Sequence, residues 1–157
     1  IGMAPRPLRI TWVLRAQLAI GPAPHDREHL QQLKAHGVRG VLSLCRPGEV
    51  AELQELGQWF ETRCTPLPDH RSDRPPTAEE LERALADLEA LLKAGPVYVH
   101  CLASMERSPL LCMAWLIRHH RLSRLEALDY LMQVHPGTSP LPEQLALLPF
   151  DPNTSLA

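Results

Sequence analysis

The amino-acid sequence predicts an α/β fold in which a central, mainly parallel sheet is flanked by helices. Short apolar runs bounded by Gly or Pro predict buried strands, and segments with helical apolar spacing separate them. After the last predicted strand, at residues 97–100, only helical patterns follow. Alternating strands and helices favour parallel pairing, because each helix carries the chain back along the sheet. With 157 residues, 45% of them hydrophobic, and no repeat or linker, we expect residues 1–157 to form a single domain.

The first predicted elements are two short strands, a helix and a longer strand. Residues 10–20 contain the two short strands. Asp26 is expected to cap a helix over residues 27–36, and Gly37 ends it. Residues 38–45 are apolar and include β-branched side chains, which is typical of a buried strand.

The next segment is expected to contain a helix, a short strand and a long loop. The predicted helix covers residues 50–62, and residues 64–67 could form a short strand. Residues 66–76 hold four prolines, which lack backbone donors and exclude a helix or a central strand. We therefore expect a loop here, long enough to carry function.

The second half of the chain is predicted to contain one strand and four helices. Capping boxes of Thr77 with Glu80 and of Ser123 with Glu126 open two of the helices. Pro109 suits the first turn of another, since its fixed φ is already helical. The predicted strand is 97–100, and the predicted helices are 77–95, 108–120, 123–134 and 142–148.

Composition excludes several classes of function. The formal charge is -2, without long runs of one sign, so we expect no nucleic-acid partner. No apolar stretch approaches the roughly 20 residues of a membrane span, and no signal peptide is recognisable, so we expect a cytoplasmic protein with no membrane partner. Cys45, Cys64, Cys101 and Cys112 lack the paired spacing of a zinc site and are too few for a disulfide scaffold. We expect reduced thiols, with Cys64 and Cys112 in the core, no metal and no cofactor.

The most informative segment is residues 97–109, with the sequence VYVHCLASMERSP. It predicts a buried strand, a tight loop and the start of a helix. Such a loop can point its backbone N–H groups at an anion, and the dipole of the following helix favours negative charge at the same place. A phosphate suits this environment. The residues expected to bind it are Leu102, Ala103, Ser104, Met105, Glu106 and Arg107.

Side chains around this loop supply the groups that phosphoryl transfer needs. Cys101 lies at the base of the loop, where the same field favours the nucleophilic thiolate. Arg107 can hold two phosphate oxygens through its planar guanidinium, which Lys cannot do. Ser108 is placed to donate a hydrogen bond to the sulfur of Cys101. His100 is expected to orient the loop beneath Cys101 and not to act as a base.

The run HC-x5-RS resembles the signature of the cysteine-dependent protein tyrosine phosphatases, in their small, atypical dual-specificity branch. The resemblance continues in WV at 12–13, LPDH at 67–70 and HP at 135–136, and it covers nearly the whole chain. It implies a dual-specificity-phosphatase-like fold, a phosphocysteine intermediate and a phosphorylated protein as substrate. One departure is Ser104, where the family usually has Gly. A serine there would be strained if its φ is positive.

The resemblance also implies two further roles. An aspartate on a separate loop before the nucleophile should protonate the leaving oxygen. Asp69, directly after the short strand expected there, is the first candidate, and Asp73 is the alternative. In part of the superfamily, a cysteine matching Cys45 forms a reversible disulfide with the nucleophile. This suggests a bridge between Cys45 and Cys101 on oxidation.

Three functions are compatible with these residues. The leading hypothesis is a phosphomonoester hydrolase, a tyrosine or dual-specificity phosphatase with Cys101 as nucleophile, Arg107 as phosphate clamp and Asp69 as general acid and base. The second is a pseudophosphatase that binds phosphoproteins, for which Ser104 is the motive. The third is a thiol enzyme of the rhodanese or arsenate-reductase kind. The loop interior carries no basic side chain, which favours phosphotyrosine or another single phosphomonoester over a highly anionic lipid headgroup.

Overall fold

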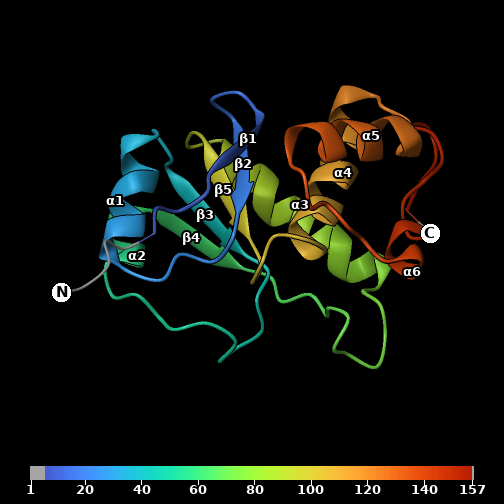
Figure 1. Cartoon of the computed structure of the whole chain (residues 1–157). Helices are drawn as coiled ribbons and strands as arrows, with labels where there is room; N and C mark the ends of the chain where they lie inside the picture. The colour runs from blue at the N-terminus through green and yellow to red at the C-terminus, as the bar shows by residue number, and fades with distance from the viewer. Residues whose placement is uncertain (1–5, 157) are drawn as a thin grey trace.

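The computed structural model describes residues 6–156, and a five-stranded sheet lies at its centre (Figure 1). The strands are β1 (Thr11–Leu14), β2 (Leu18–Gly21), β3 (Gly40–Ser43), β4 (Glu61–Cys64) and β5 (Val97–His100). Their order across the sheet is β1-β2-β5-β3-β4. Only β1 runs antiparallel to its neighbour, and the other three pairs are parallel. The predicted α/β fold with a mainly parallel sheet is confirmed.

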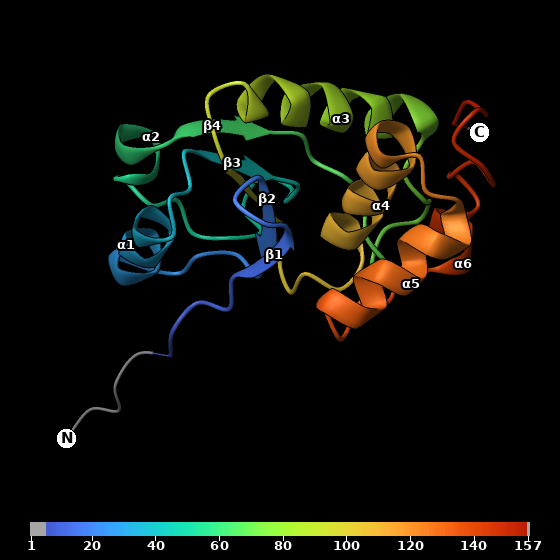
Figure 2. The same cartoon turned by 90° about the horizontal axis from the view of Figure 1, so that it is seen from above.

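Helices cover both faces of the sheet. They are α1 (Arg27–Ala35), α2 (Leu56–Trp59), α3 (Ala78–Leu92), α4 (Arg107–His120), α5 (Arg124–Val134) and α6 (Pro142–Leu145). Figure 2 shows α1 and α2 on one side of the sheet and α3 to α6 on the other. Each side has its own hydrophobic cluster, a larger one under α3 and α4 and a smaller one under α1. No helix within residues 6–156 is both long and apolar enough to cross a membrane.

The alternation of side chains along β5 decides where Cys101 points. Val97 and Val99 belong to the larger cluster, while Tyr98 between them belongs to the smaller one. Because side chains alternate along a strand, Cys101 faces the same side as Val99, toward α4. Cys112, on α4, is fully buried, as predicted.

Capping residues in the sequence predicted the starts of three helices correctly. Asp26 accepts a hydrogen bond from the amide of His29 at 2.9 Å and so opens α1. Both predicted capping boxes, Thr77 with Glu80 and Ser123 with Glu126, are formed at the starts of α3 and α5. Each box satisfies amides that would otherwise lack partners.

The predicted helix over residues 50–62 is wrong. Only Leu56–Trp59 is helical, and Glu61–Cys64 forms β4, which pairs in parallel with β3 at the edge of the sheet. The pairing of Glu61 with Gly40 supplies interstrand hydrogen bonds that a helix through residue 62 would have prevented. Every residue of β4 is exposed, so the expected core position of Cys64 is also wrong. The short strand expected at 64–67 lies earlier than predicted.

Candidate active site

Cys101 follows β5 directly, at the carboxyl end of the parallel strands, and is only 2% exposed. The loop after it is fixed by contacts on its outer side. The carbonyl of Ser104 accepts a hydrogen bond from His135 Nε2 at 2.8 Å, and that of Met105 accepts one from the amide of Ser139 at 2.7 Å. The carbonyl of Leu102 accepts one from the amide of Ala23 at 3.1 Å. The loop is therefore held from the connection after α5 and from the segment after β2.

The amides of residues 102–106 form no hydrogen bond with any other part of the chain that the structure describes. A row of free amides next to a helix start is suited to bind an anion, because the N–H groups can donate to it and the helix dipole favours its negative charge. Arg107 begins α4 at the end of this row and is 2% exposed. The loop therefore has the arrangement expected of a phosphate-binding cradle.

His100 lies beneath Cys101 as an orienting residue. Its Nδ1 is 3.1 Å from the carbonyl oxygen of Cys101, and since a carbonyl only accepts, the ring donates there. Burial lowers the pKa of His100 to about 4, so the ring is neutral at physiological pH. The neutral ring therefore fixes the backbone of Cys101.

Arg107 is held by a carboxylate that the motif did not indicate. Its Nη2 is 2.5 Å from Glu49 Oε2, and its Nη1 is 3.0 Å from Glu49 Oε1. Nη1 also donates to the carbonyls of Leu44 and Leu67. Burial opposes the charge on the guanidinium, but the hydrogen bonds to Glu49 and the charges of Cys101, Glu49 and Cys45 together outweigh it and raise the pKa of Arg107. The hydrogen bond from Arg107, partly opposed by burial, lowers the pKa of Glu49 to about 2.

Glu49 was missed by sequence reasoning, although one signal was available. A buried arginine needs a counter-charge, and acidic residues after the strand at 38–45 are the ones that topology brings near it. The side chain of Glu49 is 6% exposed and also accepts from Arg71 Nη2 at 2.9 Å. Glu49 therefore sets the position of the Arg107 guanidinium.

Asp69 lies at the same site, and Asp73 does not. Asp69 Oδ2 accepts from Arg71 Nε at 2.8 Å and lies 3.6 Å from Arg107 Nη2. Burial raises the pKa of Asp69, but the hydrogen bonds from Arg71 and the charge of Arg107 outweigh it, so the pKa is lowered. The cavity beside Cys101 holds about 270 Å³. It is lined by Asp69, His70, Arg71, Cys101, Leu102, Ala103, Met105, Glu106 and Arg107.

Ser104 has the positive φ that its place in the motif suggested, at 62°. It is 1% exposed, and its hydroxyl has no hydrogen-bond partner within residues 6–156. Glu106, two residues further on, connects this loop to the loop of Asp69. Its carboxylate accepts from the amide of His70 at 3.1 Å and lies 2.5 Å from Nδ1 of His70. The phosphate cradle and the loop of Asp69 thus contact each other directly.

Two expected interactions of sulfur are not formed in this structure. The hydroxyl of Ser108 is buried and finds no partner among the described residues, so it does not donate to Cys101. Cys45 and Cys101 are both free thiols. Cys45 lies at the carboxyl end of β3, with its sulfur 3.9 Å from His100 Nδ1, and burial followed by the charge of Glu49 raises its pKa to about 11. The pairing of Cys45 with Cys101 on oxidation stays a prediction.

Fold and site together define an α/β domain with a buried cysteine and a buried arginine at the two ends of a loop whose amides are free in the part of the chain that the structure describes. The chain matches the model of the dual-specificity phosphatase catalytic domain over residues 24–149. It is 29% identical over 126 residues to dual specificity protein phosphatase 2 of Mus musculus, covering 78% of this chain and 37% of that protein. It is 38% identical over 69 residues to dual specificity protein phosphatase 5 of Homo sapiens, covering 39% of this chain and 18% of that protein.

Solved structures agree with this match. The active form of Tk-PTP superposes with a TM-score of 0.74 at 26% identity, covering 87% of this chain and 90% of that one. A variant of human DUSP28 superposes with a TM-score of 0.69 at 26% identity, covering 89% and 90%. The chain belongs to the family of dual-specificity phosphatase catalytic domains. It spans well under half the length of the two curated relatives.

Proposed function

We propose that this protein hydrolyses phosphomonoesters on protein side chains through a phosphocysteine intermediate. The observation that carries the proposal is that Cys101, Arg107 and Asp69 line one cavity, together with a loop whose amides are free to bind an anion. The first residue supplies a nucleophile, the second a positive charge for the phosphate oxygens, and the third a proton. Membership of the family supports phosphorylated proteins as the general class of substrate.

In the first step, the Cys101 thiolate attacks phosphorus and the bond from phosphorus to the ester oxygen breaks. Asp69, in its protonated form, gives its proton to the departing oxygen, so the alcohol or phenol leaves neutral. The amides of residues 102–106 and the guanidinium of Arg107 stabilise the charge on the phosphoryl oxygens as the bonds change. Glu49 holds that guanidinium in place during both steps.

In the second step, water attacks the phosphocysteine and the bond from sulfur to phosphorus breaks. Asp69, now a carboxylate, accepts a proton from the water, and the thiolate of Cys101 is released with inorganic phosphate. Ser108 would assist this departure by rotating its unpaired hydroxyl toward the sulfur. Each group returns to its starting state.

The rim of the cavity supports a substrate with a single phosphate on an aromatic or short aliphatic carrier. Leu102 is 37% exposed and Met105 is 50% exposed, so both present apolar surface at the mouth of the cavity. Residues 102–106 carry no cation that would bind a second phosphate. We therefore propose phosphotyrosine as the preferred group, with phosphoserine and phosphothreonine also accepted.

The test is hydrolysis of p-nitrophenyl phosphate with EDTA present, from pH 4.5 to pH 8. We expect turnover by the intact protein and at least about a thousandfold loss in Cys101→Ser, because a hydroxyl is a far weaker nucleophile than a thiolate. Circular dichroism of the variant controls for folding. Turnover that survives in Cys101→Ser would contradict the proposal.

The same assay identifies the general acid. Asp69→Ala should lower kcat by about 100-fold or more, as expected for loss of general acid catalysis, while Asp73→Ala should change it less than about threefold. Asp73 is the matched control because it lies four residues away in the same loop, outside the cavity of Cys101. Equal losses in the two variants would count against the assignment of Asp69.

Ser104 favours one competing function. Its positive φ and unpaired hydroxyl indicate a strained loop, and a folded protein that binds vanadate without any turnover would be a phosphoprotein-binding pseudophosphatase. Release of thiocyanate or arsenite in the absence of phosphatase activity would instead indicate a thiol enzyme of the rhodanese or arsenate-reductase kind.

A further inference from the structure

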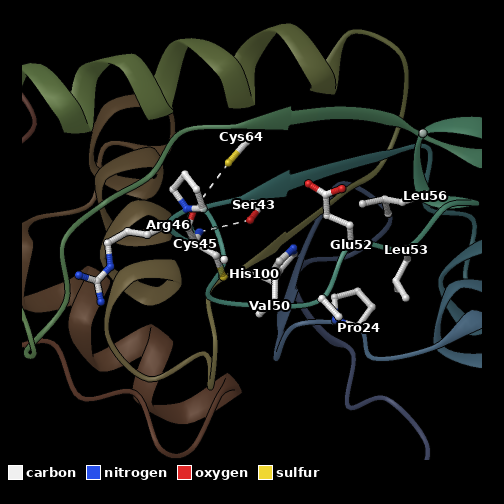
Figure 3. Close-up of a pocket in the computed structure, with 14 residues that line it drawn as sticks. Pro24, Ser43, Cys45, Arg46, Val50, Glu52, Leu53, Leu56, Cys64 and His100 are labelled. Atoms are coloured by element: carbon white, nitrogen blue, oxygen red, sulfur yellow. Dashed lines mark hydrogen bonds between the residues drawn. The ribbon is translucent and has the colours of Figure 1, made fainter.

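A second cavity of about 320 Å³ lies behind the phosphate loop (Figure 3). It shares no lining residue with the cavity of Cys101. One wall is the segment 46–57, which connects β3 to α2 and contributes most of the lining residues. Its apolar lining residues include Pro24, Pro47, Val50, Ala51, Leu53 and Leu56.

The floor of this second cavity is polar, because His100 lies there. His100 is 3% exposed, and its Nδ1 carries the proton that it donates to the carbonyl of Cys101. In a neutral imidazole, the other nitrogen then holds a lone pair and can only accept. No group within residues 6–156 donates to Nε2. Figure 3 shows the ring beside Cys45 and above Val50, with a nitrogen turned away from Cys45.

The charged side chains nearby disfavour an anion. Glu52 lines the second cavity, and its carboxylate is drawn on the side of Leu56 (Figure 3). Arg46 contributes to the wall, but its side chain points away and lies near Glu49 and Asp69. A ligand here therefore meets the acceptors His100 and Glu52 and the hydroxyl of Ser43, which already accepts from the amide of Cys45 at 3.2 Å, but no available cation.

We propose that this second cavity is a binding site for a small, mainly apolar molecule that carries an N–H or O–H donor and no negative charge. Its volume is at the lower end of the range for ligand sites, which corresponds to a ligand of one or two rings. The rings would replace water against Val50 and Leu53, and the donor would bind Nε2 of His100. This assignment does not depend on the proposed phosphatase activity.

Binding at this site would also affect the loop of residues 102–106, which follows Cys101. The segment 46–57 that closes the cavity also carries Glu49, whose carboxylate holds Arg107. His100, on the floor, supports the backbone of Cys101. A ligand that fixes this segment therefore stabilises the arrangement in which Glu49 holds Arg107.

Indole is a suitable probe, because it has two fused rings, one N–H donor and no charge. We expect titration of the ¹⁵N-labelled full chain with indole to shift the amide resonances of Val50, Leu53 and Cys101 with saturation. Benzofuran has the same size but no donor, and it should bind about tenfold more weakly because His100 would lose its partner. Equal binding of the two probes would show that Nε2 is not the contact.

Two variants and one competitor locate the site. Leu53→Trp and Val50→Phe should each abolish the saturable shifts by filling the cavity, while Leu125→Trp, on a side chain of α5 that is 77% exposed, should leave them unchanged. Two filling variants are used so that the failure of one to fold does not end the test. Vanadate should not displace indole. Displacement by vanadate, or binding that persists in both filled variants, would overturn the assignment.

Discussion

Ser104 occupies a backbone position that glycine adopts without strain. Its φ of 62° places it in the left-handed region, where a side chain with a Cβ costs about 1 kcal/mol or more. The residue is almost fully buried, and its hydroxyl is unpaired within the described chain. Two unfavourable contributions therefore meet at one residue of the phosphate cradle.

Ser104→Gly should remove both the backbone strain of the positive φ and the buried, unpaired hydroxyl. We expect the free energy of unfolding to rise by up to about 1 kcal/mol, with turnover of p-nitrophenyl phosphate kept or increased. Urea unfolding of the two proteins provides the measurement. Ser104→Ala is the control, because it removes the hydroxyl and keeps the backbone strain. A less stable glycine variant beside an unchanged alanine variant would mean that the loop favours a side chain here.

Residue roles that follow from a local motif could be predicted from the sequence, and those that depend on distant contacts could not. Cys101 and Arg107 are six residues apart on one loop, so their spacing already indicates their chemistry. Glu49 contacts Arg107 across 58 residues of chain, so no local motif marks it, and only the general need of a buried arginine for a counter-charge pointed to an acidic residue there. Whether the hydroxyl of Ser108 points toward Cys101 depends on the rotamer of its side chain, which no sequence pattern determines.

At the scale of elements, Arg71 connects the loop of Asp69 to the segment that carries Glu49. This side chain donates to Asp69 through Nε and to Glu49 through Nη2, and its Nη2 also lies 2.6 Å from Asp69 Oδ2 as an ion pair. Arg71 therefore joins the proposed general acid to the carboxylate that holds Arg107. The contacts favour the carboxylate form of Asp69. A general acid must be protonated to act, so activity that depends on it is present at low pH and lost as pH rises through the pKa of Asp69.

Arg71→Ala should therefore move the basic limb of kcat/KM to higher pH, because loss of the cation raises the pKa of Asp69. With phenyl phosphate, whose leaving group needs a proton, we expect a several-fold higher rate at pH 7 relative to the intact protein. With difluoromethylumbelliferyl phosphate, whose leaving group is stable as an anion, the profile should move much less.

Arg74→Ala is the matched control, since Arg74 lies in the same loop but pairs with Glu80 at 2.7 Å. Its pH profile should match that of the intact protein. Equal rate losses on both substrates in Arg71→Ala would indicate a purely structural role for Arg71.

The elements themselves show which signals in a sequence are dependable. The starts of α1, α3 and α5 were predicted correctly because a cap is a contact between residues three positions apart. The segment from residue 50 to residue 62 was mistaken for a helix because its edge strand, β4, is exposed throughout and carries no alternating apolar pattern. Its structure depends on pairing with β3, which is a contact between distant parts of the chain.

At the scale of the whole molecule, paired carboxylates make stability depend on pH. Arg107 and Arg74 lower the pKa values of Glu49 and Glu80 to about 2 from 4.5. A depressed pKa in the folded state adds stability that is fully present above 4.5, the value in the unfolded chain. That stability is lost as pH falls from about 4.5 to about 2. The protein should therefore unfold more easily in acid.

Glu80→Gln isolates one of these contributions. Glutamine can still complete the capping box at the start of α3, but it cannot pair with Arg74. We expect the drop in unfolding free energy between pH 5 and pH 2.5 to be smaller by about 1 kcal/mol in the variant, after allowing for screening of a partly exposed pair. Urea unfolding at the two pH values measures it. An identical drop in the two proteins would show that this pair does not contribute.

The hydrogen bonds from His135 and Ser139 to the phosphate loop extend the site beyond the sheet and α4. These two residues follow α5, more than thirty positions after Cys101. A fragment that ended at Val134 would keep every strand, the nucleophile and the arginine, yet it would lose the supports of two loop carbonyls. The part of the chain that the proposed activity requires thus reaches at least to Ser139, well beyond the last residue of the signature motif.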